Sequence, residues 1–144
     1  MQATDILIRL GNMGLKHGWV RQCQPRLLQE KISGLLQRVT EENAQADDFA
    51  RSVEVSLETL RLDYIDLLLI HWPQPAVPLE ETLGALIKAK REGLAKNIGI
   101  SNFTVELVHK AVQLSSEPIL TNQVEYHPYI NQDKILTVCR HYGI

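Results

Sequence analysis

Apolar and polar positions alternate along residues 44–144 in a rhythm of short strands and amphipathic helices. Residues 64–70 form an almost unbroken apolar run, which is closed at Pro73. Such a run predicts a strand buried on both faces, as in a parallel sheet. Two further strands are predicted over residues 96–100 and 119–124. The intervening helical spacing predicts helices from Asp47 to about Leu60, from Pro78 to a stop at Gly93, from Thr104 to about Val112, and from Gln132 to Tyr142.

Strand and helix follow one another at the spacing of βαβ units, so the sequence predicts an α/β protein with a parallel sheet. Asp47 and Thr104 are predicted to cap the helices that they begin, because their side-chain oxygens can accept hydrogen bonds from free backbone N–H groups. Gly93 and Gly143 stand where two of the helices are predicted to stop.

The N-terminal part of the chain fits this rhythm poorly, and residues 1–44 are therefore treated as a divergent, unassigned segment. Residues 5–10 are consistent with a strand, and residues 11–24 show no clear period. From Pro25 to Val39 the leucines, an isoleucine and a valine recur at helical spacing, which predicts an amphipathic helix.

Polar side chains follow each of the three predicted strands. His71 and Trp72 come after the first strand, Ser101 and Asn102 after the second, and Gln123 at the end of the third. Ligands of parallel α/β sheets bind at the carboxyl ends of the strands. An imidazole can polarise a carbonyl oxygen, while a hydroxyl and two amides can recognise a planar carboxamide. An indole can form an apolar pocket wall.

Each of these residues also has a purely structural interpretation. A histidine after a strand is commonly a satisfied structural residue, and Asn102 could simply form a turn. Gln123 could satisfy neighbouring backbone groups. The residues alone leave both interpretations open.

Composition excludes several classes of protein. The formal net charge of −2 and pI of about 6.2 argue against nucleic acid or a polybasic membrane surface as a partner. No apolar run is long enough to span a membrane, and no signal peptide is recognisable, so a cytoplasmic protein is expected. The two cysteines and five histidines lack metal-ligand spacing, so no metal site is expected. Dinucleotide-binding GxGxxG, P-loop and GxSxG motifs are absent.

Three ordered segments resemble one enzyme family, the aldo-keto reductases. LDYIDLLLIHWP at 62–73 resembles the fourth barrel strand of that family, KNIGISNF at 96–103 the fifth, and TNQVEYHPY at 121–129 the sixth. The resemblance extends over residues 45–144. It is strongest to the bacterial branch that reduces 2,5-diketo-D-gluconate and methylglyoxal-like carbonyls.

The resemblance implies a partial (β/α)8 barrel comprising about strands 4–6 with their flanking helices. It implies hydride transfer from NADPH to a small aldehyde or ketone, which becomes an alcohol. By resemblance, His71 is the catalytic residue that orients and polarises the substrate carbonyl, and Trp72 joins it in substrate binding. Ser101, Asn102 and Gln123 would bind the nicotinamide carboxamide of the cofactor.

The same resemblance implies that the catalytic set is incomplete. A full barrel needs about 250 residues. The family's proton donor is a tyrosine, activated by a lysine at the end of the third strand and accompanied by an aspartate. The first tyrosine here is Tyr64, within a predicted strand, so these three groups cannot be placed. The chain is expected to turn over weakly or not at all alone. The alternative is a non-catalytic half-barrel that binds a partner chain or self-associates through open sheet edges.

Overall fold

The computed structural model describes residues 8–9, 35–127 and 129–144 of the chain. The strands are β1 (Ile8–Arg9), β2 (Leu35–Val39), β3 (Ile65–Ile70), β4 (Ala95–Ser101) and β5 (Ile119–Gln123). The helices are the short 3-10 helix η1 (Glu41–Asn43) and the α-helices α2 (Ala46–Leu60), α3 (Leu79–Arg91), α4 (Val105–Leu114) and α5 (Asp133–Tyr142). Strand and helix alternate from β2 to α5, which confirms the predicted rhythm.

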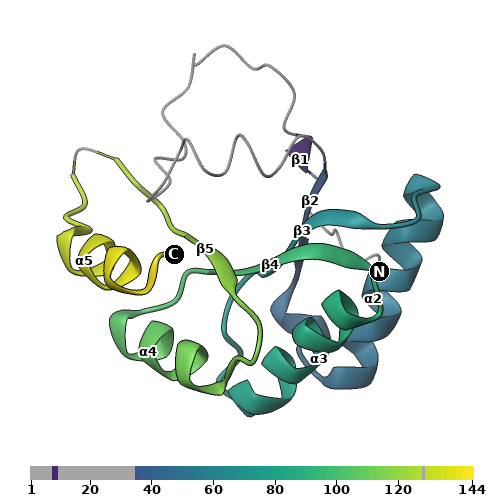
Figure 1. Ribbon diagram of the computed structural model, residues 1–144, viewed down its shortest axis with the longest axis horizontal. Coiled ribbons are helices and arrows are strands. Elements are labelled where there is room, and N and C mark those ends of the chain that lie inside the picture. The colour runs from purple at the N-terminus through teal and green to yellow at the C-terminus, as the bar shows by residue number, and fades with distance from the viewer. Residues whose placement is uncertain (1–7, 10–34, 128) are drawn as a thin grey trace.

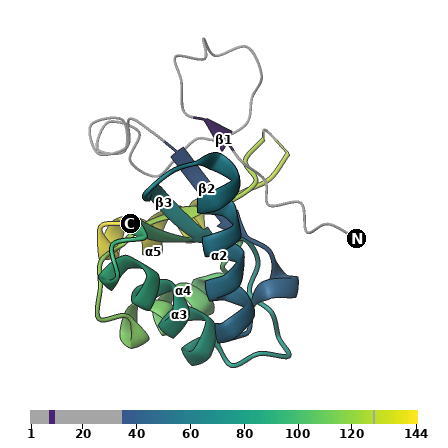
Figure 2. The same ribbon diagram turned by 90° about the vertical axis from the view of Figure 1, so that its right-hand side faces the viewer.

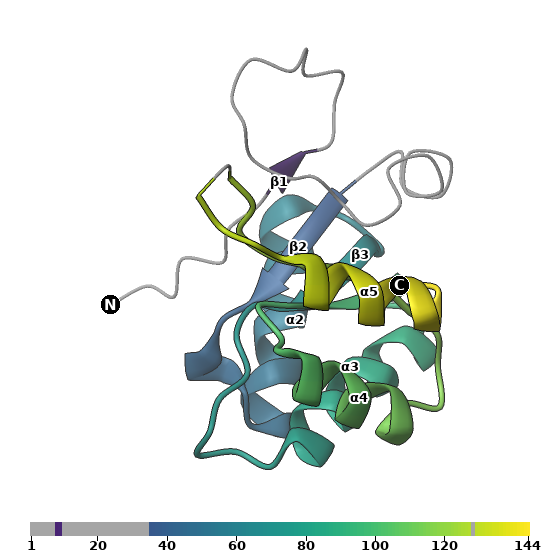
Figure 3. The ribbon, with the colours of Figure 1, turned by 90° about the vertical axis from the view of Figure 1, so that its left-hand side faces the viewer.

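The strands form one sheet in the order β1-β2-β3-β4-β5. Strands β2 to β5 run parallel, and β1 pairs with β2 in the antiparallel direction. Helices α2, α3 and α4 lie on the same side of the sheet (Figure 1), and the view turned by 90° agrees (Figure 2). Helix α5 packs against α4 (Figure 3). Parallel strands joined by helices on one side form the repeating unit of a (β/α)8 barrel.

Strand β3 is buried on both faces, as its continuous apolar sequence predicts. Leu68 and Ile70 belong to the large core on the helix side, together with Phe49 of α2. Leu67 and Leu69 alternate with them along the strand and belong to a separate cluster, because successive side chains of a strand point to opposite faces. We call the face of the sheet that carries Leu67 and Leu69 the inner face.

Helices end and begin largely where the sequence predicts. The Thr104 side chain accepts a hydrogen bond from the backbone N–H of Leu107 (3.4 Å), which caps α4. Gly93 and Gly143 have φ angles of 80° and 73°, a conformation that glycine adopts without steric cost. Each follows the end of a helix, so both predicted stops are confirmed.

The predicted cap at Asp47 is wrong. Helix α2 begins at Ala46, and Asp47 lies in its first turn. The free N–H of Ala46 donates to Glu81 Oε1 of the neighbouring helix α3 (3.0 Å). Glu81 therefore supplies the hydrogen-bond acceptor at the start of α2 that Asp47 was predicted to supply. The Asp47 carboxylate still complements the positive end of the helix dipole.

The helix predicted from Pro25 to Val39 is also wrong over its last five residues, which form β2. Leu36 pairs with Leu67 and Val39 pairs with Ile70 in the parallel ladder with β3. The sequence Leu-Leu-Gln-Arg-Val suits either element locally, and pairing with an already buried strand decides the outcome. The remainder of that predicted helix lies outside the described residues. Of the strand predicted over residues 5–10, only Ile8–Arg9 is described, as β1.

Gly99 is required by close packing on the inner face of the sheet. A Cβ atom at this position would lie 2.5 Å from Leu69 Cδ2 and 2.9 Å from Thr121 Cγ2. We therefore expect Gly99→Ala to lower the free energy of unfolding by about 1–3 kcal/mol, measured by urea denaturation. Gly84→Ala in α3, which meets no described atom within 4 Å, should instead raise it by about 0.5–1 kcal/mol. Equal stability of Gly99→Ala and wild type would contradict this packing.

Candidate functional site

The polar ends of β3, β4 and β5 meet at one edge of the sheet. Asn102 Nδ2 donates to the backbone carbonyl of His71 (3.0 Å), which joins the end of β4 to the end of β3. Ser101 Oγ donates to the backbone carbonyl of Gln123 (2.8 Å), and the Asn102 backbone N–H donates to the same oxygen (2.8 Å). Four of the five predicted site residues therefore form one hydrogen-bonded group.

Asn102 turns the chain at the end of β4. Its φ of 61° lies in the left-handed region, which asparagine tolerates better than most residues. Its Nδ2 also donates to Ser101 Oγ (3.2 Å). Both partners of Nδ2 are acceptors here, so the NH2 group faces inward. Within the described part of the chain no hydrogen bond reaches Asn102 Oδ1, and this acceptor remains available.

Ser101 holds the strand ends together. Its side chain is buried, and its hydroxyl proton is used in the bond to the Gln123 carbonyl. One of its two lone pairs accepts from Asn102 Nδ2. A single lone pair is left for any other partner.

His71 is partly buried directly after β3. Its backbone N–H donates to the Val39 carbonyl (2.9 Å), which fixes it beside the end of β2. Burial lowers the pKa of the imidazole below its usual 6.5, and the positive charge of Arg38 lowers it further. Glu41 opposes this shift. At neutral pH the ring is therefore uncharged, with one N–H donor and one acceptor nitrogen.

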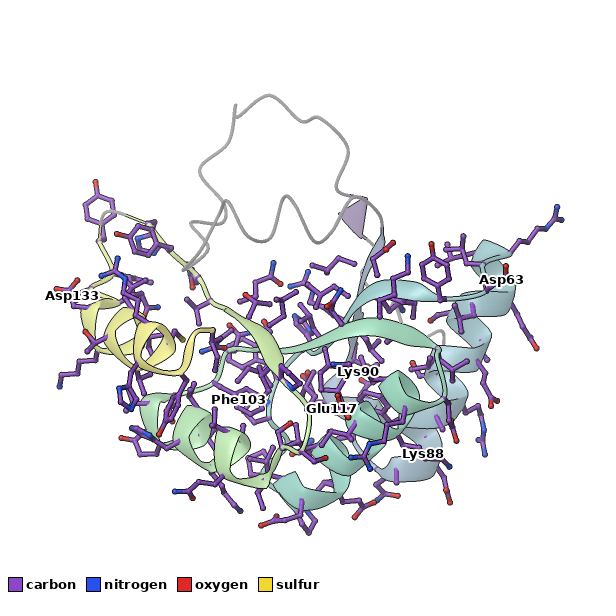
Figure 4. The ribbon with its side chains drawn as sticks, viewed as in Figure 1. Asp63, Lys88, Lys90, Phe103, Glu117 and Asp133 are labelled. Atoms are coloured by element: carbon purple, nitrogen blue, oxygen red, sulfur yellow. The ribbon has the colours of Figure 1, made fainter. Side chains whose placement is uncertain are left out.

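Trp72 is 48% exposed and stands edge-on to the His71 ring, with 6.2 Å between the ring centroids. It lines an open cavity of about 460 Å³ together with Asn102, Phe103 and Ile135. Phe103 lies between the sheet and α4 in Figure 4. His71, Ser101 and Gln123 do not line this cavity. Trp72 and Asn102 thus connect the cavity to the hydrogen-bonded group.

Arg38 is a residue of this edge that the sequence analysis missed. It projects from β2, and its Nη1 donates to Gln123 Oε1 of β5 (3.3 Å). The signal that could have found it is its position in a short apolar segment, one residue before the end of a strand. Because the spacing in that segment predicts a helix, the sequence does not group Arg38 with the strand ends.

Two further histidines make contacts within the fold. His127 Nε2 lies 3.2 Å from Glu125 Oε1, and its Nδ1 accepts from the Tyr129 backbone N–H (3.2 Å). His109 Nδ1 lies 2.7 Å from the Tyr142 hydroxyl and links α4 to α5. Among the described residues, no group of three or more His, Cys, Asp or Glu side chains is arranged to hold a metal ion. No helix of the described segments has the length and apolar character needed to cross a membrane.

The sequence matches the family model of the aldo/keto reductases over residues 28–144, so the chain belongs to the aldo/keto reductase family. This match begins upstream of residue 45, where the resemblance found in the sequence begins. The sheet and its helices are accordingly part of a (β/α)8 barrel.

Relatives within the family are similar to this chain over most of its length. A methylglyoxal reductase of Escherichia coli O157:H7 is 46% identical over 106 residues, which is 72% of this chain and 40% of that protein. A crystal structure provisionally designated 2,5-diketo-D-gluconic acid reductase B aligns with a TM-score of 0.74 at 46% identity, covering 76% of this chain and 39% of that one. A Bombyx mori aldo-keto reductase in complex with NADP aligns at 0.71 and 31% identity, covering 76% and 38%. The chain thus spans about two fifths of the length of these relatives.

Proposed function

We propose that this chain carries the histidine and the carboxamide-binding part of a site that reduces small carbonyl compounds with NADPH. The observation that carries the proposal is the joined edge of β3, β4 and β5, where Asn102 Nδ2 donates to the backbone carbonyl of His71 and Arg38 orients the Gln123 amide. The relatives include a methylglyoxal reductase, which supports an aldehyde or ketone of the methylglyoxal or diketogluconate type as substrate. NADP in the Bombyx mori relative supports NADPH as the cofactor.

The amides at this edge fit a nicotinamide carboxamide. A carboxamide offers one oxygen acceptor and one NH2 donor. Asn102 Oδ1 is an available acceptor for that NH2 group, and Gln123 Nε2 is an available donor for that oxygen. The remaining lone pair of Ser101 Oγ would assist Asn102. NADPH supplies the hydride when it is bound.

His71 and Trp72 would act on the substrate. A neutral imidazole can donate its N–H to the carbonyl oxygen, which orients the carbonyl and draws electron density from its carbon. The exposed Trp72 would form an apolar wall against the substrate, between His71 and the cavity.

Turnover by this chain alone is proposed to be weak or absent. The resemblance calls for a lysine at the end of the third strand, whereas β2, which precedes β3 in the sheet, carries Arg38 near its end. An arginine stays protonated in proteins and is a poor substitute for a lysine in proton transfer. Loss of general-acid catalysis would lower the rate by about 10²–10⁴-fold.

A second possibility is a half-barrel that self-associates or pairs with another chain. Strand β5 is the last strand of the sheet, and within the described residues no strand pairs with its outer edge. An unpaired edge is a template for pairing with another chain. Sedimentation of the purified chain as a dimer or larger species, without NADPH binding, would favour this function.

The cofactor site is tested by the tryptophan fluorescence of the full chain during titration with NADPH. Trp19 and Trp72 are the two tryptophans, and Trp72 lies beside the proposed nicotinamide position. We expect saturable quenching in the wild type and loss of most of that quenching in Trp72→Phe. Calorimetric titration should show that the variant still binds NADPH within about threefold of wild type, because phenylalanine keeps the apolar wall.

Gln123→Leu is the matched variant for this titration. It should keep the Trp72 signal and lose affinity for NADPH by about tenfold, because one hydrogen bond to the carboxamide is removed. A wild-type chain that unfolds cooperatively but shows no saturable quenching and no calorimetric binding would contradict the proposed cofactor site.

A further inference from the structure

The contact between Arg38 and Gln123 spans the inner side of the sheet. Arg38 comes from β2 and Gln123 from β5, and two strands lie between them. In a flat sheet the two strands would be separated by three strand spacings, or about 14 Å. A separation of 3.3 Å between Nη1 and Oε1 therefore requires a curved sheet and two side chains that extend toward each other.

Within the described segments, no ion pair accounts for the Arg38 guanidinium. Its pKa is lowered by burial, and no salt bridge to it is found among the described residues. Its Nε is buried and has no hydrogen-bond partner within the described segments. Holding a partly buried charge without a carboxylate partner is unfavourable, and an apolar side chain would usually fill such a place more stably.

The chemistry of the guanidinium settles how the Gln123 amide is oriented. Arginine has only donors, so the amide atom that faces it is the oxygen. The Nε2 of Gln123 is consequently its free end and offers two N–H donors. If Arg38 were absent, the amide could turn over and present its oxygen instead, because its terminal torsion is broad and roughly two-fold.

We infer that Arg38 is a positioning residue of the cofactor half of the site. By holding Gln123 Oε1, it presents Gln123 Nε2 to the carboxamide oxygen and leaves the carboxamide NH2 to Asn102 Oδ1. The inference rests on the proposed function. The positive charge of Arg38 is also one of the groups that keep the neighbouring His71 uncharged.

The test measures the dissociation constant of NADPH for wild type, Arg38→Met, Gln123→Leu and the double variant of the full chain. Arg38→Met should weaken NADPH binding by about tenfold, since one oriented hydrogen bond is lost. If Arg38 acts through Gln123, the double variant should bind no more weakly than Gln123→Leu. If the loss of affinity in the double variant equals the product of the two single losses, the inference is overturned.

A cofactor analogue identifies which end of the carboxamide is involved. The reduced 3-acetylpyridine analogue of NADPH keeps the oxygen and replaces the NH2 group by a methyl group. Arg38→Met should weaken the analogue by the same factor as NADPH, because Arg38 governs the contact to the oxygen. A loss confined to NADPH would mean that Gln123 reads the NH2 group, and would overturn the inference.

Two further variants separate positioning from folding. Arg38→Lys keeps a charged donor, so its affinity for NADPH should lie between those of wild type and Arg38→Met. It replaces Arg38→Met in the comparison with wild type if that variant folds poorly. Arg51→Met on the exposed surface of α2 should bind as wild type does. Binding of NADPH by wild type with no change in Arg38→Met or Arg38→Lys overturns only the role of Arg38. Absence of NADPH binding by folded wild type overturns the proposed function as well.

Discussion

Replacing Phe49 by alanine is expected to lower the free energy of unfolding by about 3–5 kcal/mol, the largest loss of any single substitution considered for this chain. Phe49 is fully buried in the core between α2 and the sheet. Truncation removes the apolar surface that attaches α2 and leaves a cavity that the surrounding strands can only partly fill. Urea denaturation followed by circular dichroism measures the change.

Val55→Ala on the same helix is the matched control for Phe49→Ala. Val55 is 53% exposed, so its truncation should change the free energy of unfolding by no more than about 0.5 kcal/mol. Phe49→Leu should fall between the two, and it keeps the comparison measurable if the alanine variant is unfolded at room temperature. Similar losses in Phe49→Leu and Val55→Ala would show that α2 is not docked through Phe49.

Asn122→Leu is expected to have the second largest effect, through unsatisfied backbone groups. Asn122 is buried at the end of β5, and its Oδ1 accepts from the Phe103 backbone N–H (3.3 Å) while its Nδ2 donates to the Phe103 carbonyl (3.1 Å). Leucine has the same branched skeleton but satisfies neither group. Each of the two backbone groups left without a partner is expected to cost about 1–2 kcal/mol, so the free energy of unfolding should fall by about 2–4 kcal/mol in urea denaturation.

Asn97→Leu is the control for Asn122→Leu on the same sheet. Asn97 is half-buried and donates a single bond to the Asp66 carbonyl (3.1 Å) at the start of β4. It should be less destabilising in urea denaturation. It should also leave the affinity for NADPH unchanged, whereas Asn122→Leu weakens it because the turn that carries Asn102 precedes Phe103. Equal losses of stability in the two variants would contradict this account.

Ion pairs on the helix side are expected to matter less than these buried groups. Lys90 of α3 and Glu117 before β5 lie together in Figure 4, with 3.1 Å between Nζ and Oε2. Arg91 also approaches Glu117, at 3.3 Å between Nε and Oε1. Pairs near the surface contribute little because water screens them and because ordering long side chains costs entropy.

The sequence predicts an element reliably where the residues of that element alone determine its structure. Residues 64–70 are apolar at nearly every position, so only a strand buried on both faces suits them, and β3 is such a strand. The segment Leu35–Val39 is shorter and contains both apolar and polar residues. Whether it forms a strand depends on pairing with β3, which lies far from it in the sequence. Local periodicity carries no information about such a partner.

The candidate site was predicted residue by residue, but its hydrogen bonds were not. Three strand ends with polar side chains were visible in sequence because parallel strands end at one edge. The contact from Arg38 to Gln123 depends on the curvature of the whole sheet, and the pairing of β4 with β5 shifts register between Ile98 and Ile100. Neither feature leaves a local pattern, so the orientation of the amides emerges only from the structure.

The bonds that join the strand ends divide this edge into positions where folding depends on backbone groups and positions where it depends on a particular side chain. In the bonds among β3, β4 and β5, His71 and Gln123 take part through backbone groups, and every amino acid except proline carries both the N–H and the carbonyl. Ser101 and Asn102 contribute side chains as well. A library randomised at positions 71, 72 and 123 should therefore yield mostly folded members. In a library randomised at 101 and 102, the folded members should carry serine, asparagine or residues with similar side chains. Selectivity for new carbonyl compounds can be sought at position 72 without rebuilding the frame, because His71 and Gln123 carry the proposed contacts to the carbonyl and to the cofactor.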